Sequence, residues 1–325
     1  MKSHVGALLG DLPEPDRTAA EAVRRRAARV LRPGGALARL DEIAAWLAGW
    51  QRTDAPEVRA PTVLVFAGDH GVTDEEVGPY PPEITASMVK AMEEGVATVS
   101  VMAREVGAAL RVVDVGVGMP TGNIAREPAM SDERFLEAFD AGRASVGSPD
   151  LLILGEVGIG NTTAAAAVSA ALFGGSADRW TGPGSGSTGE RFRRKLAVVE
   201  AAAARNVGAH PIDVLRDAGG TELAAICGAA LEARRRSIPV VLDGFVVAAS
   251  VAPLELLRAG ALDHCIAGHR SPEPGHGLLL DRLGRRPILD LEMRLGEGTG
   301  AVAALPLIRL AASCVRDVAT FEEWM

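Results

Sequence analysis

Short, continuous apolar runs alternate with alanine-rich helical stretches along most of this chain. The runs expected to form strands cover residues 62–67, 110–115, 151–154 and 238–242, with weaker candidates at 262–267 and 287–291. Helices are expected near 17–32, 36–51, 83–106, 131–145, 161–173, 189–206, 220–236, 246–259 and 299–313. Strands without polar alternation are buried on both faces, and intervening helices provide parallel crossovers. The pattern therefore predicts an α/β fold with a parallel sheet covered on both sides.

Glycine together with an ionisable residue follows four of the expected strands. The four segments are Gly68–Gly71 (GDHG), Gly155-Glu156, Asp243-Gly244 and Gly268–Ser271 (GHRS). In open α/β sheets, ligands bind beyond the carboxyl ends of the strands, so these segments together predict one shared crevice. The alternative is that Asp and Ser cap the helices that follow. For Asp243 taken alone, the two interpretations are equally open.

Two glycine-rich segments are candidates for binding an anion. Gly155–Thr163 (GEVGIGNTT) leaves a strand and opens a helix, which places backbone and hydroxyl donors at a helix N-terminus. It matches neither the Walker loop nor the dinucleotide fingerprint. Thr181–Gly189 is followed by Arg191 and Lys195, which share one helix face. That face either reaches a phosphate or is a solvated basic surface.

A third segment, Met293–Ala301 (MRLGEGTGA), places Glu297 between two glycines just before a helix. A carboxylate in that position is either an anion that interacts with the helix dipole or an accessible general base. The flanking glycines favour the second interpretation, because they carry no side chains that would keep a ligand away from Glu297.

Metal-ligand spacing is lacking in the sequence. The candidate oxygen and nitrogen donors are Asp69, His70, Asp243, His264, His269 and His276, and no two histidines share a helix face in the way zinc sites require. The cysteines Cys227, Cys265 and Cys314 are too far apart for a zinc pattern and odd in number. We expect no metal, no disulfide framework and buried free thiols.

Charge and hydropathy argue against a nucleic-acid-binding protein and against a membrane protein. Lys and Arg number 34 against 42 Asp and Glu, a net charge of −8, which disfavours binding to nucleic acid. The basic run Arg24–Arg26 is flanked by acidic residues and is interpreted as a solvated helix face. The longest apolar stretch expected, 244–254, is shorter than the roughly 20 residues that span a bilayer, and the N-terminus does not resemble a signal peptide. These features predict a cytoplasmic protein without membrane or nucleic-acid partners.

Several long motifs resemble the nicotinate-nucleotide–dimethylbenzimidazole phosphoribosyltransferase family, and the resemblance covers nearly the whole chain. The motifs begin at Ala67 (AGDHGVTDEEVGPYPPEIT), Asn123 (NIAREPAMS), Gly155 (GEVGIGNTTAAAA), Arg194 (RKLAVVE), Gly219 (GGTELAAICGA), Ile238 (IPVVLDGF), Gly268 (GHRSPEPGH) and Met293 (MRLGEGTGA). Their number and order make the resemblance specific.

The resemblance implies a large Rossmann-like three-layer domain with a mostly parallel sheet, over residues 56–270. It also implies a small helical domain from both chain ends, 1–55 with roughly 270–325, and a homodimer. The implied reaction moves phosphoribose from nicotinate mononucleotide to 5,6-dimethylbenzimidazole, without a cofactor, and gives α-ribazole 5′-phosphate and nicotinate. Alternatives are the same chemistry with benzimidazole, adenine or a phenol as acceptor, or a nucleotide-binding relative that has lost catalysis.

The matching motifs also imply roles for single residues. Glu297 matches the catalytic base and Glu156 a second active-site carboxylate. Four residues are expected to hold phosphate and ribose: Gly158, Lys195, Ser271 and Arg294. Four more are expected to form an apolar slot for the flat base: Tyr80, Pro81, Met88 and Leu295. The segment 116–122 is shorter than in many members of the family, which leaves the identity of the acceptor base open.

Overall fold

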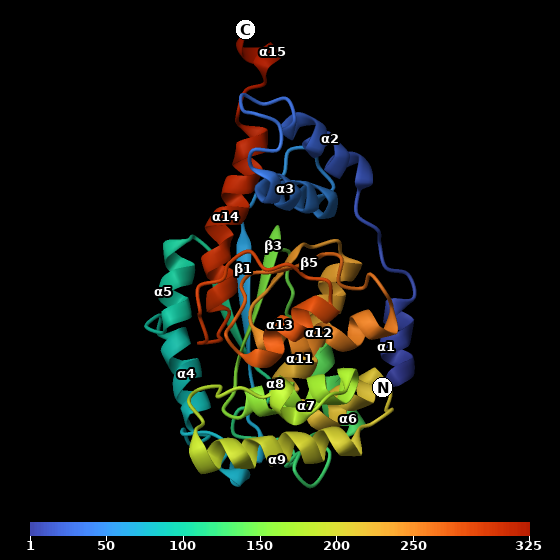
Figure 1. Ribbon diagram of the computed structural model, residues 1–325, viewed down its shortest axis with the longest axis vertical. Coiled ribbons are helices and arrows are strands. Elements are labelled where there is room, and N and C mark those ends of the chain that lie inside the picture. The colour runs from blue at the N-terminus through green and yellow to red at the C-terminus, as the bar shows by residue number, and fades with distance from the viewer.

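A computed structural model describes the whole chain, residues 1–325, and its centre is a five-stranded sheet (Figure 1). The strand order is β2-β1-β3-β4-β5, and every pairing is parallel. The strands are β1 (Pro61–Ala67), β2 (Ala109–Asp114), β3 (Leu151–Val157), β4 (Val240–Leu242) and β5 (Cys265–Ala267). The prediction of an α/β fold with a parallel sheet is therefore confirmed.

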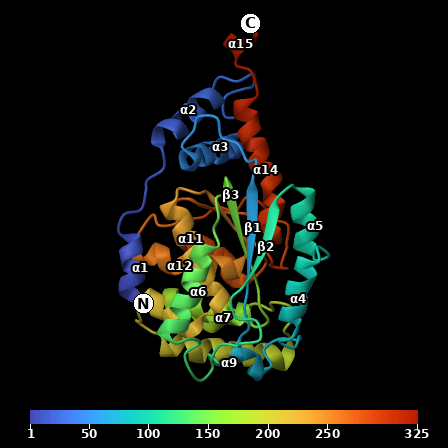
Figure 2. The ribbon, with the colours of Figure 1, turned by 180° about the vertical axis from the view of Figure 1, so that it is seen from behind.

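Helices cover both faces of this sheet, as Figures 1 and 2 show. The first half of the chain contains α1 (Lys2–Leu9), α2 (Arg17–Ala27), α3 (Ala38–Gln51), the 3₁₀ helix η1 (Gly71–Glu75), α4 (Ile84–Glu93), α5 (Thr98–Glu105) and α6 (Asp132–Ala144). The second half contains α7 (Asn161–Phe173), α8 (Ala177–Trp180), α9 (Gly189–Arg205), α10 (Pro211–Ala218), α11 (Thr221–Arg235), α12 (Phe245–Leu257), α13 (Pro274–Arg282), α14 (Thr299–Arg316) and α15 (Phe321–Trp324).

Alternate residues of the strands belong to two separate hydrophobic cores. Leu64 and Phe66 of β1 face a core of 55 buried residues that also includes apolar side chains of α6, α7, α11 and α12. Val63 and Val65 face a second core of 27 buried residues, to which α3, α5 and α14 contribute. Because both faces of each central strand are covered, a continuous apolar run is the sequence that such a strand requires.

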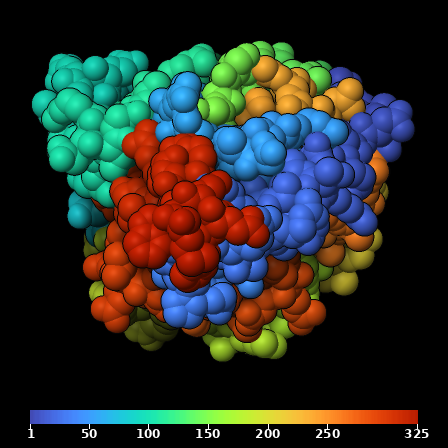
Figure 3. Space-filling view, turned by 90° about the horizontal axis from the view of Figure 1, so that it is seen from above, coloured from blue at the N-terminus to red at the C-terminus, as the bar shows by residue number.

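Both chain ends contribute helices beside the amino edge of the sheet. Helices α2 and α3 pack against each other and against α14, and Figure 3 shows the N-terminal and C-terminal segments side by side on this end of the molecule. The Arg26 guanidinium joins them by donating to the Glu323 carboxylate and to the carbonyl oxygen of Val315. Helix α1 lies elsewhere, where Lys2 donates to Asp213 of α10. The division at residues 55 and 270 remains a prediction.

Several elements differ from those expected. Strand β3 continues to Val157, so Glu156 lies within the strand and pairs in register with Phe66 of β1. Residues 287–291 form no strand and make only an isolated bridge between Leu289 and His269. The helix expected over 83–106 is two helices, α4 and α5, separated by a turn in which Gly95 has φ +77°.

The longest apolar helix is α14 rather than the stretch expected at 244–254. It has 18 residues and a mean hydropathy of 1.3, which by length and composition would suffice to cross a membrane. Arg309 and Pro306 interrupt its apolar sequence, so a search for continuous apolar runs does not find it. Its apolar face packs on α3 and α5, as expected for a core helix of a folded domain. All three cysteines are free, with Cys314 only partly buried.

Candidate active site

A cavity of about 420 Å³ lies at the carboxyl edge of the sheet. It is lined by residues 158–162, which lead from β3 into the first turn of α7, by the segments that follow β4 and β5, and by the turn that precedes α14. Three of the four polar strand ends singled out in the sequence contribute to the wall, through Glu156, Gly244 and Ser271. Asp69 and His70, after β1, lie outside it.

Eight of the ten residues predicted for the site line this cavity. They are Tyr80, Met88, Glu156, Gly158, Ser271, Arg294, Leu295 and Glu297. Pro81 is exposed next to Tyr80 and does not line the cavity. The fold thus brings together residues that lie far apart in the sequence.

Lys195 is the second predicted residue that does not line the cavity. Its ammonium group is buried and donates to the Thr162 hydroxyl and to the carbonyl oxygen of Gly182, both at 2.9 Å. Burial lowers the pKa of Lys195 to about 8, although the nearby Glu273 carboxylate partly opposes this shift. Lys195 therefore ties the glycine-rich loop that begins at Thr181 to the first turn of α7.

Glu156 is a buried carboxylate that accepts a hydrogen bond from the side-chain amide of Asn161. Burial raises its pKa well above the usual value for glutamate, and the negative charges of Asp243, Glu222 and Glu297 raise it further. Asn161, at the first position of α7, is the only partner that favours the ionised form. A carboxylate held in this way is typical of an active site rather than of a structural ion pair.

Glu297 lies beside Glu156 and projects from the turn before α14. Its backbone N–H donates to the Glu156 carbonyl oxygen at 3.0 Å, and its buried Oε2 atom has no hydrogen-bond partner. Burial raises the pKa of Glu297, as does the charge of Asp243. The neighbouring Gly296 has φ +86°, and a Cβ there would lie 2.7 Å from Glu156 Oε1. Only glycine therefore lets the turn before α14 pass this close to the Glu156 carboxylate.

Apolar side chains line part of the cavity, and six of them are called its apolar wall below: Tyr80, Ile84, Met88, Phe245, Val246 and Leu295. Tyr80 and Leu295 are 51% and 54% exposed, so this wall is open to solvent on one side. A flat aromatic molecule could lie against these side chains, next to the carboxylates.

The polar wall contains groups that suit an anionic ligand. The Arg294 guanidinium donates to the Gly184 carbonyl oxygen at 3.2 Å and also faces the cavity. The Ser271 backbone N–H donates to Nδ1 of His276 at 2.9 Å. Burial lowers the pKa of His276 to about 3, so this imidazole is neutral and acts as an acceptor that orients Ser271.

Three features of the site were not assigned by sequence reasoning. His70 Nε2 lies 2.5 Å from the Glu222 carboxylate in a fully buried pair beneath the turn at Gly158. Glu273 accepts a hydrogen bond from the Gly184 backbone at 2.9 Å. Asn161 holds Glu156, as described above. No spacing signal could have found the His70–Glu222 pair, because its members are 152 residues apart.

For Asp243 the sequence left a place in the crevice and a cap on the next helix equally open, and the structure shows neither, because Asp243 does not line the cavity and caps a distant helix. Its carboxylate accepts hydrogen bonds from the backbone N–H groups of Gly298 and Ala301, at 3.2 and 2.9 Å. It therefore caps α14, which begins more than 50 residues later, rather than α12, the helix that directly follows it. Of the candidate metal donors, Asp243 and His269 lie 3.6 Å apart, but the structure contains no group of three or more His, Cys, Asp or Glu side chains that could hold a metal ion.

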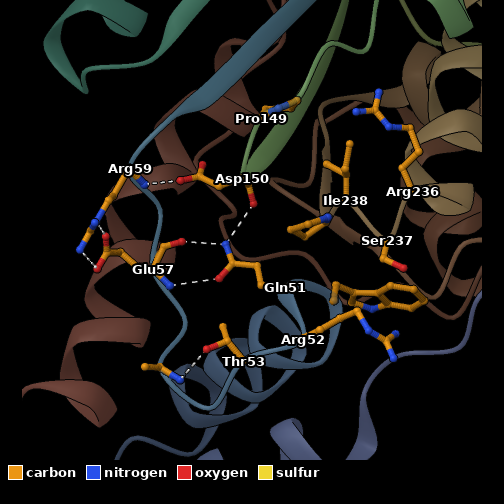
Figure 4. Close-up of a pocket in the computed structure, with 13 residues that line it drawn as sticks. Gln51, Arg52, Thr53, Glu57, Arg59, Pro149, Asp150, Arg236, Ser237 and Ile238 are labelled. Carbon is orange, nitrogen blue, oxygen red and sulfur yellow. Dashed lines mark hydrogen bonds and ion pairs between the residues drawn. The ribbon is translucent and has the colours of Figure 1, made fainter.

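A second hollow, at the amino edge of the sheet, is lined by charged groups that already bind one another (Figure 4). The Glu57 carboxylate pairs with Arg59, and the Asp150 carboxylate accepts from the Arg59 backbone N–H at 2.5 Å. The Gln51 amide donates to the carbonyl oxygens of both Glu57 and Asp150. These contacts order the chain before β1.

The parallel sheet, the cavity at its carboxyl edge and the two carboxylates with raised pKa together define an α/β enzyme with a site for a small polar ligand and a flat apolar one. Comparison with known proteins specifies the family. The family model described as Phosphoribosyltransferase matches residues 12–324. The chain therefore belongs to this phosphoribosyltransferase family, as its motifs indicated.

Two curated relatives carry the name nicotinate-nucleotide–dimethylbenzimidazole phosphoribosyltransferase. The protein of Brucella anthropi is 47% identical over 320 residues, and that of Rhizobium rhizogenes is 48% identical over 318 residues. Each match covers 97% of this chain and 94% of the relative. The crystal structure of CobT from Thermus thermophilus superposes with a TM-score of 0.90 at 41% identity, and the match covers 94% of this chain and 98% of that one.

Proposed function

We propose that this enzyme transfers phosphoribose from nicotinate mononucleotide to 5,6-dimethylbenzimidazole, and produces α-ribazole 5′-phosphate and nicotinate. The observation that carries the proposal is the Glu297 carboxylate, which lines the same cavity as Glu156 and the apolar side chains and whose buried Oε2 atom has no hydrogen-bond partner. The names of the relatives support the choice of substrates.

The reaction needs little more than a base and an electrostatic environment. Nicotinate leaves through a pyridinium nitrogen that becomes neutral as the bond to C1′ breaks, so the departing group requires no proton. No pyrophosphate leaves, so no divalent cation is required to neutralise one. One benzimidazole nitrogen attacks C1′ from the face opposite the leaving group, which inverts the β-glycosidic bond to α.

Glu297 takes the N–H proton of the benzimidazole as the other ring nitrogen attacks. Removing this proton makes the attacking nitrogen more electron-rich, and a positioned base typically contributes about 10²–10⁴-fold to such a step. The Glu156 carboxylate stabilises the positive charge that develops on the ribosyl centre. Its burial strengthens this interaction, because water does not screen it.

The remaining wall residues hold the two substrates. Gly158, Ser271 and Arg294 bind the phosphate and ribose of the nucleotide, while Tyr80, Met88 and Leu295 contact the planar base. Lys195 acts on the nucleotide through Thr162, which lines the cavity and which the ammonium group holds. Pro81 supports the slot by fixing the backbone next to Tyr80.

A panel of acceptors tests the substrate assignment. Purified enzyme is incubated with nicotinate mononucleotide and, in turn, with dimethylbenzimidazole, benzimidazole, adenine and p-cresol, and nicotinate release is measured. We expect dimethylbenzimidazole to react fastest, because the wall around Tyr80, Met88 and Leu295 is apolar and offers adenine few polar partners. A preference for another acceptor would retain the chemistry and reassign the base, whereas release with none would favour a binding protein without catalysis.

The raised pKa of Glu297 predicts an unusual pH profile. A general base must be ionised, so kcat/KM falls as pH decreases through the pKa of Glu297 in the free enzyme. Because burial and then the Asp243 charge raise that pKa, we expect the acidic limb at a higher pH than an ordinary glutamate would give. Steady-state kinetics across the acidic and neutral pH range measure it. A profile that stays flat down to the usual glutamate range would contradict the assignment of Glu297 as base.

The assembly and the location of the enzyme remain proposals that follow from the family. We propose a homodimer that works in the cytoplasm. Sedimentation velocity of the purified protein measures the mass in solution, and a monomer at micromolar concentration would contradict the first proposal.

A further inference from the structure

The backbone around Glu297 has an uncommon conformation. Gly296, Glu297 and Gly298 have φ values of +86°, +62° and +86°, so three consecutive residues are left-handed. Glutamate rarely adopts this conformation, and a side chain held there depends on its surroundings to keep it in place. Only five of the residues other than glycine have a positive φ in this protein, and Glu297 alone among them lines the cavity.

The carboxylate of Asp243 accepts two hydrogen bonds that hold this turn in place. One carboxylate oxygen accepts the N–H of Gly298 at 3.2 Å, and the other accepts the N–H of Ala301 at 2.9 Å. Asp243 is 1% exposed and does not line the cavity, so it has no direct contact with a bound substrate. It extends from the end of β4, a central strand, and therefore connects the turn to a rigid part of the sheet.

Two further contacts hold the turn around Glu297 in place. The Glu297 N–H donates to the carbonyl oxygen of Glu156, within β3, and Gly155 packs so closely that a Cβ there would lie 2.5 Å from the Gly298 nitrogen. The turn is thus fixed to β3 on one side and to β4 on the other. Among these contacts, only those of Asp243 are made by a side chain. They are therefore the ones that a single substitution can remove.

We propose that Asp243 is a positioning residue for the reaction: its carboxylate caps α14 and so keeps Glu297 in the left-handed conformation that aims the base at the acceptor. The inference rests on the proposed role of Glu297 as base. Asp243 holds the loop and exchanges no proton with the substrate.

The test compares Asp243→Asn with the wild-type enzyme. Asparagine has nearly the same shape, but its NH₂ group must face one of the two backbone N–H groups, which pushes the turn away. We expect kcat to fall by about 10–100-fold, because a displacement of about 1 Å in a reacting group has effects of this size. Asp243 makes no hydrogen bond to Gly158, Ser271 or Arg294, and the cavity-lining side chain that it pairs with is His269, whose Nε2 lies 3.6 Å away. The KM and the Kd for nicotinate mononucleotide therefore stay within about 2-fold.

Asp16→Asn is the matched control. Asp16 caps α2 in the same way, through a 3.0 Å hydrogen bond from the Ala19 N–H, and lies far from the cavity. Asparagine at position 16 still accepts the single N–H of Ala19, so Asp16→Asn changes the charge of a helix cap without displacing the backbone and should keep wild-type turnover, whereas Asp243→Asn loses turnover. A crystal structure of Asp243→Asn should also show residue 297 outside the left-handed region. If kcat of Asp243→Asn stays within about 2-fold of the wild-type value, the inference is wrong.

Gly298→Ala tests the same inference by removing the contact with Asp243 from the other side. Alanine disfavours φ +86°, so the N–H of residue 298 turns away from Asp243 while the carboxylate itself is intact. A loss of kcat with unchanged nucleotide affinity supports the inference, and an unchanged kcat overturns it, even where Asp243→Asn does not fold. A wild-type enzyme that releases no nicotinate with any acceptor would refute the proposed function instead, so the two failures are distinguishable.

Discussion

Glu297→Gln is expected to lower kcat by about 10²–10⁴-fold, because the amide cannot accept the proton of the benzimidazole. Glutamine keeps the size and the left-handed backbone of the native residue, so the cavity retains its shape. Binding of nicotinate mononucleotide, measured by calorimetry, should remain within about 2-fold of the wild-type value. Steady-state kinetics with dimethylbenzimidazole then isolate the contribution of the base.

Glu292→Gln is the control for this substitution. Glu292 lies shortly before Glu297 in the chain, also has a positive φ, of +56°, and is exposed outside the cavity. Neutralising it should leave kcat unchanged. Turnover of Glu297→Gln near the wild-type rate would show that another group accepts the proton.

Glu156→Gln is expected to give a slower but more stable enzyme. The substitution removes a charge that stabilises the ribosyl centre in the transition state, and a loss of about 10²–10³-fold in kcat is typical for a buried electrostatic contact. It also removes a carboxylate that burial and three neighbouring charges disfavour. Glutamine can still accept the hydrogen bond from Asn161. A substitution that lowers kcat and raises stability is characteristic of an active-site residue.

The pH dependence of this stability gain has a definite sign. The pKa of Glu156 in the folded state lies well above its ordinary value, so between the two the folded protein binds more protons than the unfolded chain. The free energy of unfolding therefore decreases as pH rises through this window, and the loss is complete above the folded-state pKa. Thermal unfolding of Glu156→Gln should exceed the wild-type Tm by about 2–4 °C at pH 8 and by less at pH 5.

Glu292→Gln again provides the control, because it removes an exposed charge and should leave the Tm within about 1 °C. A lower Tm for Glu156→Gln at pH 8 would mean that its carboxylate stabilises the fold. The interpretation of Glu156 as a functional residue in an unfavourable environment would then be wrong.

The sheet and much of the site could be predicted from local sequence. Continuous apolar runs such as 151–154 identify buried parallel strands, because such strands are covered on both faces. The carboxyl ends of parallel strands lie at one edge, which is why Glu156 and Ser271 could be placed in one cavity without knowledge of the fold. The glycines around Glu297 indicated an accessible carboxylate, and in the structure Glu297 is buried, lines the cavity and has one carboxylate oxygen, Oε2, without a hydrogen-bond partner.

What the sequence could not predict depends on contacts between distant segments. Asp243 interacts with the start of α14, a contact that neither of the two interpretations of its position in the chain included. Lys195 was expected to face a phosphate, but its ammonium group is satisfied by Thr162 and Gly182 behind the loop. Helical periodicity places a residue on a face and does not show which segment covers that face.

The most direct test of the proposed reaction is the identity and anomeric configuration of the product. The enzyme is incubated with nicotinate mononucleotide and 5,6-dimethylbenzimidazole, and the ribosyl product is isolated and examined by proton NMR. In-line attack with Glu297 as base predicts one nicotinate released for each α-ribazole 5′-phosphate formed. A β-configured product, or a nucleotide that is bound and returned unchanged, would contradict it.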